Sequence, residues 1–258
     1  MRQLLLIGFL LLGPQTWAAG QLNLCKIDTD AAPWMLKDGV GLNNVLLSMV
    51  EKKLAMRFDI EALPWKRCLA AVAAGTKDGA LSASFNAERN GFALFPMQAD
   101  GKTPDANRRI MFESYSLYRR KGDPLSWDGS KLTGMKPGGF VAIQLGYSIS
   151  KDLQQMGVPY EESEKSVAPL LRKLEHKLVD AVATLTNDGD SGITALRLQG
   201  VIERIEPPLV RKPYFLIFSR AAKLPTELPG RVWAALEEAR ESPEYLTTVR
   251  QHGYLGTP

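Results

Sequence analysis

The pattern of apolar and polar residues divides the first half of the chain into alternating strands and helices. Residues 22–27 alternate as a half-buried strand does, and residues 56–63 form a second such run. Between them, apolar residues recur at steps of three and four, which predicts an amphipathic helix after Gly41. A second helix is predicted to begin at Pro64, and residues 78–83 to form a third strand. This order predicts a parallel sheet with right-handed crossovers.

The second half of the chain repeats this alternation and then returns. The pattern predicts strands at 110–120, 140–144 and 180–183, and helices at 149–156 and 167–174. Towards the end it predicts a hydrophobic strand at 214–218, a helix at 227–241 and a short helix from Pro243 to Gly253. We therefore expect two similar α/β lobes, with the chain crossing to the second near residues 113–116.

The first residues have the pattern of a secretory signal peptide. One basic residue, Arg2, precedes an unbroken apolar run at 4–13, and small residues follow as far as Gly20. The run is shorter than the roughly 20 apolar residues that a membrane span requires. Residues 1–19 are therefore predicted to be a signal peptide cleaved at or near Ala18, which would place the mature chain in the periplasm. An uncleaved anchor is the alternative.

Charge and composition argue against several classes of function. The full chain has 32 basic and 28 acidic residues, and loss of Arg2 leaves 31 − 28 = +3 as the formal charge. Basic residues are scattered rather than arranged in a stripe, so nucleic-acid binding is not predicted. The sequence indicates no cofactor, and two histidines with two cysteines are too few ligands to suggest a zinc site.

Cys25 and Cys68 are the two cysteines of the chain. An even number of cysteines in an exported chain favours a disulfide. Cys25 lies in the first predicted strand and Cys68 in the helix after the second, and such elements can be neighbours in an α/β lobe. Two buried thiols are the alternative. Catalysis by either cysteine is not expected, because neither His176 nor His252 lies in a context that suggests a partner.

Hydroxyl groups and one guanidinium cluster at the end of the third predicted strand. Ser82 lies near this end, and Ser84 and Arg89 follow in what is predicted to be a loop. Ligands of open α/β sheets bind beyond the carboxyl ends of the strands. Arginine pairs with carboxylates through a planar two-toothed fork. These residues predict the edge of a pocket for a small anion. The alternative is that Arg89 is a surface cation beside Glu88.

This part of the chain resembles extracytoplasmic solute-binding proteins of the polar-amino-acid type, bacterial solute-binding family 3. The resemblance rests on the turn at 75–78, the Ser-containing segment at 81–89, and residues 92–96. It implies an α/β fold of the type II periplasmic-binding-protein kind, with two α/β lobes joined by crossover strands. The implied segments are 20–113 for the first part of lobe 1, 114–215 for lobe 2, and 216–258 for the return that completes lobe 1.

The resemblance also implies where a ligand would bind. Ser82, Ser84 and Arg89 would hold an anionic group of a small solute. Asp28, at the end of the first strand, and Trp34 in the loop after it would line lobe 1. A turn that opens a helix would offer backbone amides from lobe 2; its residues are Gly146, Tyr147 and Ser148. The protein would be a monomer that delivers the solute to an ABC permease or reports it to a membrane sensor.

Several positions depart from the resembled pattern. Ala31 replaces an aromatic residue that members commonly carry, and Leu185 stands where amino-acid-binding members carry a carboxylate for the ligand ammonium. Asp188 and Asp190 lie a few residues on and offer an alternative register. A buried ammonium without a counter-charge is unfavourable by several kcal/mol. The sequence therefore favours a carboxylate or another small anion over an amino acid.

Two other functions remain open. A solute sensor or adaptor would keep the fold with a degenerate pocket, and the residues that suggest this are Ala31, Leu145 and Leu185. Less favoured is a dehydratase-like enzyme, in which a cleft carboxylate such as Asp28 would act as an acid and would have a strongly raised pKa. No Ser-His-Asp set or metal-binding motif is visible in the sequence, so we expect binding without catalysis.

Overall fold

The computed structural model describes residues 20–35 and 41–251. The predicted signal peptide at 1–19 lies outside the described residues, and so do His252 and the predicted end of the last helix at Gly253. Among the residues that are described, none of the helices combines the length and the apolar character needed to cross a bilayer.

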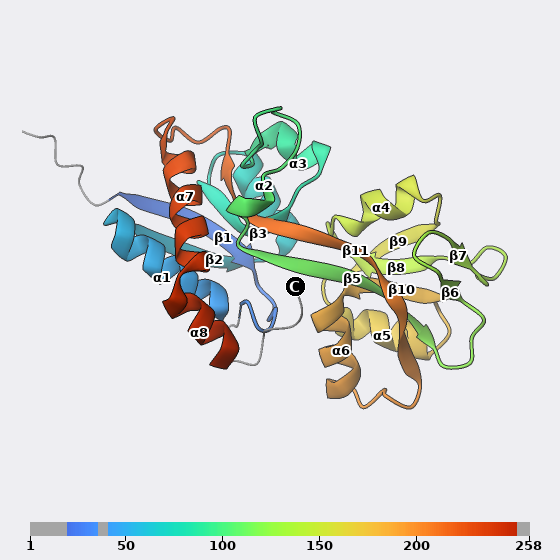
Figure 1. Cartoon of the computed structure of the whole chain (residues 1–258). Coiled ribbons are helices and arrows are strands. Elements are labelled where there is room, and N and C mark those ends of the chain that lie inside the picture. Colours follow the sequence, from blue (N-terminus) through green and yellow to red (C-terminus); the bar gives the residue numbers. More distant parts are fainter. Residues whose placement is uncertain (1–19, 36–40, 252–258) are drawn as a thin grey trace, which may run out of the picture.

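The described chain forms two α/β lobes that share one continuous sheet (Figure 1). Its strands follow the order β2-β1-β3-β11-β5-β10-β8-β9, and β4 pairs with β11 outside that path. The strands of lobe 1 are β1 (Gln21–Ile27), β2 (Arg57–Leu63), β3 (Gly79–Ser84) and β4 (Ala93–Leu94). Those of lobe 2 are β8 (Val141–Gln144), β9 (Tyr160–Glu164) and β10 (Ala181–Leu185). As predicted, β1 pairs in parallel with both β2 and β3.

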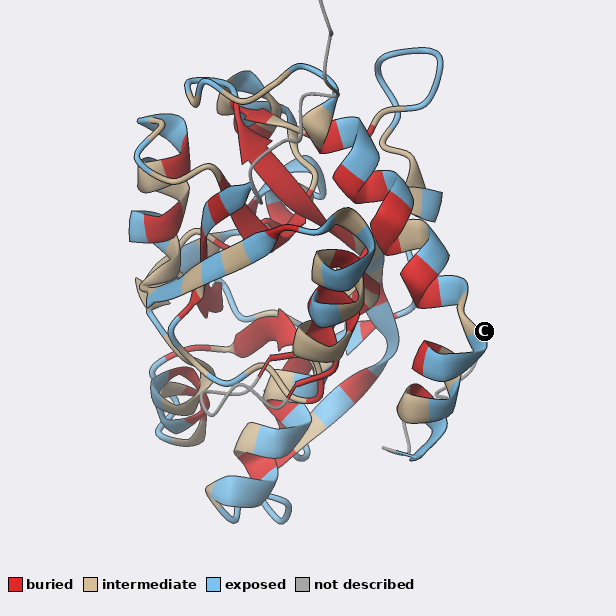
Figure 2. Cartoon of the chain, turned by 90° about the vertical axis from the view of Figure 1, so that its left-hand side faces the viewer, coloured by how far each residue is buried: buried red, intermediate tan, exposed pale blue. Residues whose placement is uncertain are grey.

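Helices cover both faces of the sheet in lobe 1. These helices are α1 (Leu42–Leu54), α2 (Trp65–Ala73), α7 (Leu228–Glu241) and α8 (Pro243–Gln251). Successive side chains of a strand point to opposite faces. In β1, Leu24 packs into the cluster that contains α1 and α7, whereas Cys25 packs into the cluster that contains α2. Figure 2 shows the result on the helices, where buried and exposed positions alternate along each ribbon.

Lobe 2 has its own apolar core. Its helices are α4 (Ile149–Gln155), α5 (Val167–Glu175) and α6 (Thr186–Ala195). Leu170, Leu171 and Leu174 of α5 pack with Tyr118 and Val182 in one fully buried cluster. The connection into this lobe carries a two-stranded ribbon of β6 (Ser126–Trp127) and β7 (Leu132–Thr133).

Two long antiparallel strands connect the lobes. They are β5 (Met111–Arg120) and β11 (Ile202–Ser219), and Figure 1 shows them running side by side across the gap. A short 3₁₀ helix (Ala106–Arg108) precedes β5. The predicted return strand at 214–218 is the last part of β11, which already begins in lobe 2. The predicted lobe boundaries, after 113 and after 215, both fall inside these strands and stay predictions.

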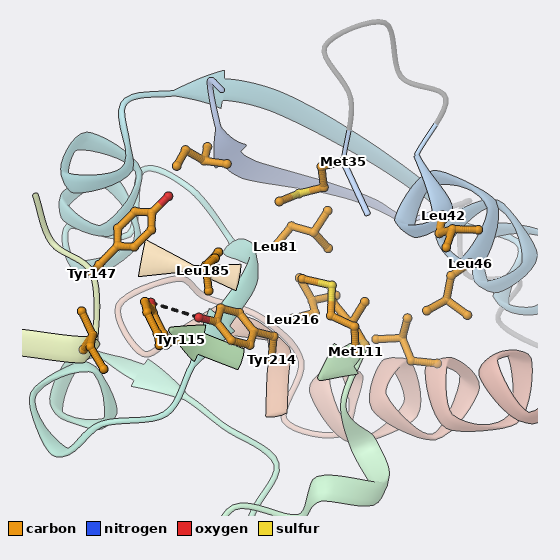
Figure 3. Close-up of a cluster of buried hydrophobic side chains, with 14 of the residues drawn as sticks. Met35, Leu42, Leu46, Leu81, Met111, Tyr115, Tyr147, Leu185, Tyr214 and Leu216 are labelled. Carbon is orange, nitrogen blue, oxygen red and sulfur yellow. Dashed lines mark hydrogen bonds between the residues drawn. The ribbon is translucent and has the colours of Figure 1, made fainter. Parts of the chain in front are cut away.

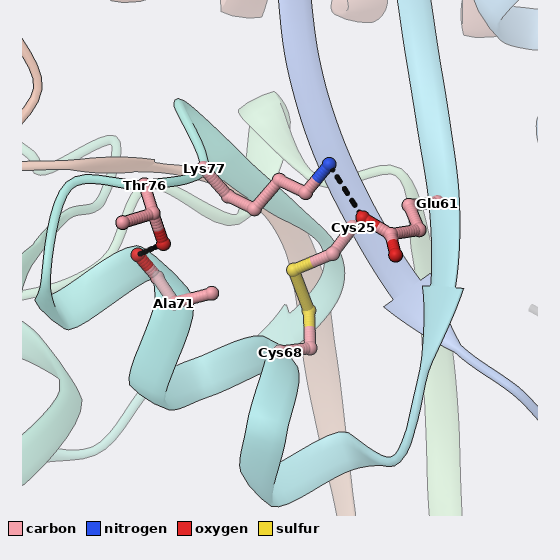
Figure 4. The surroundings of a disulfide bond; sticks show 6 residues. All are labelled: Cys25, Glu61, Cys68, Ala71, Thr76 and Lys77. Atoms are coloured by element: carbon pink, nitrogen blue, oxygen red, sulfur yellow. Dashed lines mark hydrogen bonds and ion pairs between the residues drawn. A yellow bond between two sulfur atoms is a disulfide. The ribbon is translucent and has the colours of Figure 1, made fainter.

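Cys25 and Cys68 form a disulfide, as predicted (Figure 4). Their Cα atoms are 5.7 Å apart, and both side chains are buried in the cluster between α2 and the sheet. Close by, the Lys77 ammonium lies 2.8 Å from a carboxylate oxygen of Glu61, which ties the turn before β3 to β2. The disulfide therefore fastens α2 to the first strand, and α2 leads directly into β3.

The segment after β3 differs from the predicted loop. Ser82 and Ser84 lie within β3, and Arg89 lies in a short helix, α3 (Ala87–Phe92). The side-chain oxygen of Asn86 accepts a hydrogen bond from the backbone N–H of Arg89 at 2.7 Å and caps this helix. The loop prediction was wrong because an N-cap residue starts a helix here that is too short to show apolar periodicity.

Candidate ligand-binding site

A cavity lies between the lobes, beside the end of β3 and the two crossover strands. In this closed form the volume open to a water-sized sphere is about 40 Å³. Ten of its lining residues are apolar or aromatic: Ile27, Ala31, Met35, Leu81, Met111, Leu185, Trp65, Tyr115, Tyr147 and Tyr214. The others are Ser82, Ser84, Arg89 and Glu113. Figure 3 shows Met35, Leu81, Leu185 and the three tyrosines gathered at this place. The wall is therefore mainly apolar, with one guanidinium and one carboxyl group.

Arg89 joins the two lobes at the cavity wall. Its side chain is buried, with 4% of its surface exposed. Its Nη1 donates to the Ser84 carbonyl oxygen at 2.8 Å and to Ser84 Oγ at 3.1 Å, and its Nη2 donates to the Gly146 carbonyl oxygen of lobe 2 at 2.9 Å. Its guanidinium also lies 5.5 Å from the centre of the Trp65 ring. Burial lowers the pKa of Arg89, yet an arginine stays charged at neutral pH. All three acceptors are neutral, so they do not cancel this charge.

Other direct contacts also join the two lobes. They are the Ser84 and Ser148 hydroxyls at 2.7 Å, the ion pair of Lys66 with Glu162 at 3.1 Å, and that of Lys151 with Glu88 at 3.2 Å. The two ion pairs are largely exposed, and such pairs contribute about 0–1 kcal/mol each. The backbone N–H of Gly146 donates to a Glu162 carboxylate oxygen at 2.8 Å, so this turn amide already has an acceptor. The structure is therefore that of a closed form.

Glu113 is the acidic residue of the cavity wall. It lies on β5 with 5% of its surface exposed. Burial and, to a smaller extent, the nearby carboxylate of Asp188 raise the pKa of Glu113 to about 8. The indole N–H of Trp34 and the side chain of Asn187 face this carboxyl and act in the opposite direction. Burial also raises the pKa of Asp188, which begins α6, to about 7. Both carboxyls therefore hold protons near neutral pH more readily than usual.

Three tyrosines form the floor of the cavity. The Tyr214 hydroxyl donates to the Tyr115 hydroxyl at 3.1 Å, as Figure 3 shows. Tyr147 of lobe 2 meets the Tyr115 ring edge-on, with 6.4 Å between ring centres. Burial raises the pKa of Tyr115 to about 12 and raises those of Tyr147 and Tyr214 well above the usual value. All three phenols therefore stay neutral at physiological pH and offer hydroxyl groups rather than charges.

Local backbone structure explains how Ser82 reaches the cavity. It has a positive φ of 64°, which is uncommon for a residue other than glycine, and β11 shifts its register opposite this part of β3. The Ser82 hydroxyl accepts a hydrogen bond from the Asn43 side-chain amide at 3.0 Å. The same hydroxyl donates to the Met35 sulfur at 3.8 Å, so its partners are side chains of lobe 1.

The structure brings most of the predicted binding residues together. Those that line the cavity are Ser82, Ser84, Arg89 and Tyr147. Gly146 and Ser148 reach it indirectly, through their hydrogen bonds to Arg89 and Ser84. Asp28 is exposed and Trp34 lies behind Glu113, and neither lines the cavity. The binding roles of all eight residues stay predictions.

Sequence reasoning missed Glu113, Tyr115 and Tyr214. The sequence did carry a signal for Glu113, because it is the one charged residue at 110–118, where the other residues are apolar or carry a hydroxyl group. Nothing comparable marks the two tyrosines, whose alternation fits an ordinary strand. Within the described parts of the chain, no group of three or more His, Cys, Asp or Glu side chains is placed to hold a metal ion.

Comparison with solved structures shows what this architecture is. A sensor domain of a histidine kinase with similarity to periplasmic binding proteins superposes with a TM-score of 0.73 at 16% identity, covering 92% of this chain and 97% of the other. The arginine-, lysine-, histidine-binding protein ArtJ from Geobacillus stearothermophilus gives 0.69 at 17%, covering 92% and 96%. This chain has the type II periplasmic-binding-protein-like fold.

Further structures with this fold extend the comparison. The GluR0 ligand-binding core from Nostoc punctiforme, in complex with L-glutamate, gives a TM-score of 0.65 at 17% identity over 89% of this chain and 98% of that one. No protein-family model matches the chain, and no curated protein matches its sequence. The predicted fold class is thus confirmed, at identities where the fold alone is shared.

Proposed function

We propose that the protein binds a small anionic or amino-acid-like solute between its two lobes. The observation that carries this proposal is the buried guanidinium of Arg89 in the wall of a mainly apolar cavity. An anionic group entering the cavity would replace the Gly146 carbonyl as a partner of Arg89. Such charge-assisted hydrogen bonds are stronger than the neutral ones they replace. Cavities of this kind, apolar with a few convergent polar groups, suit small molecules.

The proposed setting is the periplasm, with delivery of the solute to an ABC transporter. The sequence pattern of a signal peptide at 1–19 supports export. Solved structures with this fold include the substrate-binding protein of an amino-acid ABC transporter, which supports the transport role. The protein would act as a monomer that opens and closes by bending at β5 and β11. Binding would proceed without turnover of the solute.

A binding screen tests the proposal. The mature protein is unfolded, dialysed and refolded to remove any bound solute, and is then melted with amino acids, simple carboxylates, sulfonates and phosphates. A ligand at a hundred times its dissociation constant stabilises the folded form by about 2.7 kcal/mol, which raises Tm by several degrees. Arg89→Lys keeps the charge but loses the fork, and we expect it to weaken binding of the hit at least tenfold.

The matched control for this change is Arg67→Lys, because Arg67 lies on the exposed side of α2 and does not line the cavity. It should leave the affinity unchanged. A hit that binds Arg89→Lys and Arg89→Ala as tightly as the wild-type protein would place the solute elsewhere. If no compound in the library raises the Tm of the wild-type protein, a role in binding these solute classes is refuted.

A second candidate is a sensor or adaptor, and a specific observation favours it. The lobes contact each other directly through the hydrogen bonds of Arg89 with Gly146 and of Ser84 with Ser148, and these contacts need no bridging solute. The sensor domain of a histidine kinase with the same fold fits this role. Small-angle scattering separates the two candidates, since a transport protein without solute should expand relative to the closed structure and an adaptor should not.

An enzyme on this fold is the weaker alternative. The raised pKa expected of its acid is found at Glu113, whereas the predicted acid, Asp28, is exposed and does not line the cavity. A carboxyl of this kind can act as a general acid. To test this, each hit is incubated with the protein, and NMR shows whether the ligand has lost water or has otherwise been converted. An unchanged ligand supports binding alone.

A further inference from the structure

The cavity combines Arg89 with a buried acid that the sequence analysis did not consider. Glu113 comes from the crossover strand β5 and Arg89 from α3, and both line the cavity with about 5% or less of their surface exposed. They do not neutralise each other, because Arg89 donates to Ser84 and Gly146. Within residues 20–35 and 41–251, no cation is among the groups that shift the protonation of Glu113. The cavity wall therefore carries a guanidinium and, apart from it, a carboxyl group.

We propose that Glu113 determines specificity by binding a protonated nitrogen of the solute, so that the solute carries a cationic nitrogen as well as an anionic group. This inference rests on the proposed function, since it concerns the same cavity. It assigns the cation-binding role to a residue of the crossover strand β5. The sequence resemblance had instead pointed to position 185, at the end of β10, which is a leucine in this chain.

The surroundings of Glu113 explain why a cation would bind there. A buried carboxylate without a counter-charge is unfavourable, so the carboxyl of the empty cavity keeps its proton. The groups that shift its protonation are Asp188 of α6, Asn187 beside it, and Trp34 of lobe 1, and none of these brings a positive charge. Lys212 lies opposite Glu113 on β11, but its ammonium pairs with the carboxylate of Asp152. A protonated nitrogen would supply a positive charge, and the carboxyl proton would then pass to solvent while the nitrogen keeps its own.

The opposite wall makes Glu113 the acid best placed for this role. Leu185 lines the cavity at the end of β10 and offers no polar atom. Asp190, one of the alternatives considered from the sequence, pairs with Arg204 and accepts a hydrogen bond from Tyr118, away from the cavity. Asp188 acts on Glu113 but does not line the cavity. Tyr115 and Tyr147 provide ring surfaces nearby, and cations bind favourably over such rings.

The experiment compares ligands that differ in the nitrogen alone. Isothermal titration calorimetry is run at pH 7 with three pairs: alanine and propanoate, leucine and 4-methylpentanoate, phenylalanine and 3-phenylpropanoate. The proteins are the wild type, Glu113→Gln and the control Glu161→Gln, which removes an exposed acid on β9 outside the cavity. Each binding pair is repeated in phosphate and in Tris, because the difference in apparent enthalpy between the two buffers counts released protons.

We expect the wild type and Glu161→Gln to bind at least one amino acid at least tenfold more tightly than its desamino partner. Glu113→Gln should reduce that ratio to threefold or less. Because its raised pKa keeps the Glu113 carboxyl mostly protonated at pH 7, binding should release most of one proton in the wild type. Glu113→Gln should release much less. A melting curve verifies that this isosteric variant is folded.

Two results would overturn the inference, and they separate it from the proposed function. Suppose that a desamino carboxylate binds as tightly as the matching amino acid, and that Arg89→Lys weakens its binding. Arg89 then binds the anionic group as proposed, and the role of Glu113 is wrong. The same holds if the nitrogen preference and proton release persist in Glu113→Gln. If neither member of any pair binds the wild-type protein, and the wider library also gives no hit, both proposals fail.

Discussion

Replacement of Glu113 by Gln should stabilise the protein without solute, and increasingly so as the pH rises. The pKa of Glu113 is raised from 4.5 to about 8 in the folded state, so between these pH values the folded state holds a proton that the unfolded chain has lost. Stability therefore falls as the pH rises through this window. Gln keeps the shape of the side chain and does not titrate, so the variant lacks this loss.

The magnitude follows from the width of the window. The two pKa values differ by 8 − 4.5 = 3.5, and each unit corresponds to about 1.36 kcal/mol, so the complete loss is about 5 kcal/mol. Between pH 5 and pH 7 the expected loss is about 2–3 kcal/mol. The pKa of Asp188 is raised to about 7, so its titration also lowers the stability over a similar pH range in both proteins. The difference between wild type and variant thus reports Glu113 together with its interaction with Asp188.

The assay is urea unfolding at pH 5, 6, 7 and 8, followed by tryptophan fluorescence and far-UV circular dichroism. The free energies of unfolding of the two proteins should diverge by about 2–3 kcal/mol from pH 5 to pH 7, with the variant the more stable. Glu161→Gln should run parallel to the wild type. Parallel curves for Glu113→Gln as well would refute the argument, since they would mean that Glu113 titrates alike in the folded and unfolded chain.

Two further predictions concern the fold. Replacing both Cys25 and Cys68 by Ser should lower the free energy of unfolding by about 4 kcal/mol, the chain-entropy value for a loop of 43 residues, measured by urea unfolding; a loss below about 1 kcal/mol would contradict the reasoning. Gly189→Ala should destabilise by about 1–3 kcal/mol because the new Cβ would overlap the buried Tyr118 ring. Gly91→Ala, at a helical glycine with open space around it, should be neutral or stabilising in the same urea unfolding experiment. If Gly189→Ala and Gly91→Ala change the free energy of unfolding equally, the predicted overlap with Tyr118 is wrong.

The sequence predicted the elements whose apolar pattern is long and regular. The helix α1 and the parallel pairing of β1 with β2 and β3 are examples. The sequence pattern did not predict β9, an edge strand in which Glu161, Glu162 and Glu164 replace apolar residues. It also did not predict α6, because the two glycines of this segment disfavour a helix. It also shortened β11, because the charged residues and prolines before Tyr214 do not follow the pattern of a buried strand. Pairing with β5 at residues 202–205 and 210–214, and not local preference, holds that segment extended.

The candidate site shows a similar limit. Arg89 and the serines could be found because they follow one strand closely in the sequence. Glu113 reaches the same cavity from a strand that begins about 20 residues later, and the sequence does not say which of the alternating residues on a crossover strand faces the cleft. The hydrogen bond between the Ser84 and Ser148 hydroxyls joins residues 64 positions apart in different lobes. It depends on how the lobes meet, and the local sequence around neither serine predicts it.

The position of β11 in the sheet also orders events during folding. β3 pairs on one side with β11, at Ser84 opposite Tyr214, a separation of 214 − 84 = 130 residues. Lobe 2 forms from a continuous stretch of chain between these partners, whereas the sheet of lobe 1 stays incomplete until β11 arrives. Contacts between residues so far apart form slowly, because a long loop must close first. During synthesis, which begins at the N-terminus, lobe 2 can therefore fold before lobe 1. Until the last quarter of the chain is made, the edge of β3 stays unpaired and needs protection from aggregation.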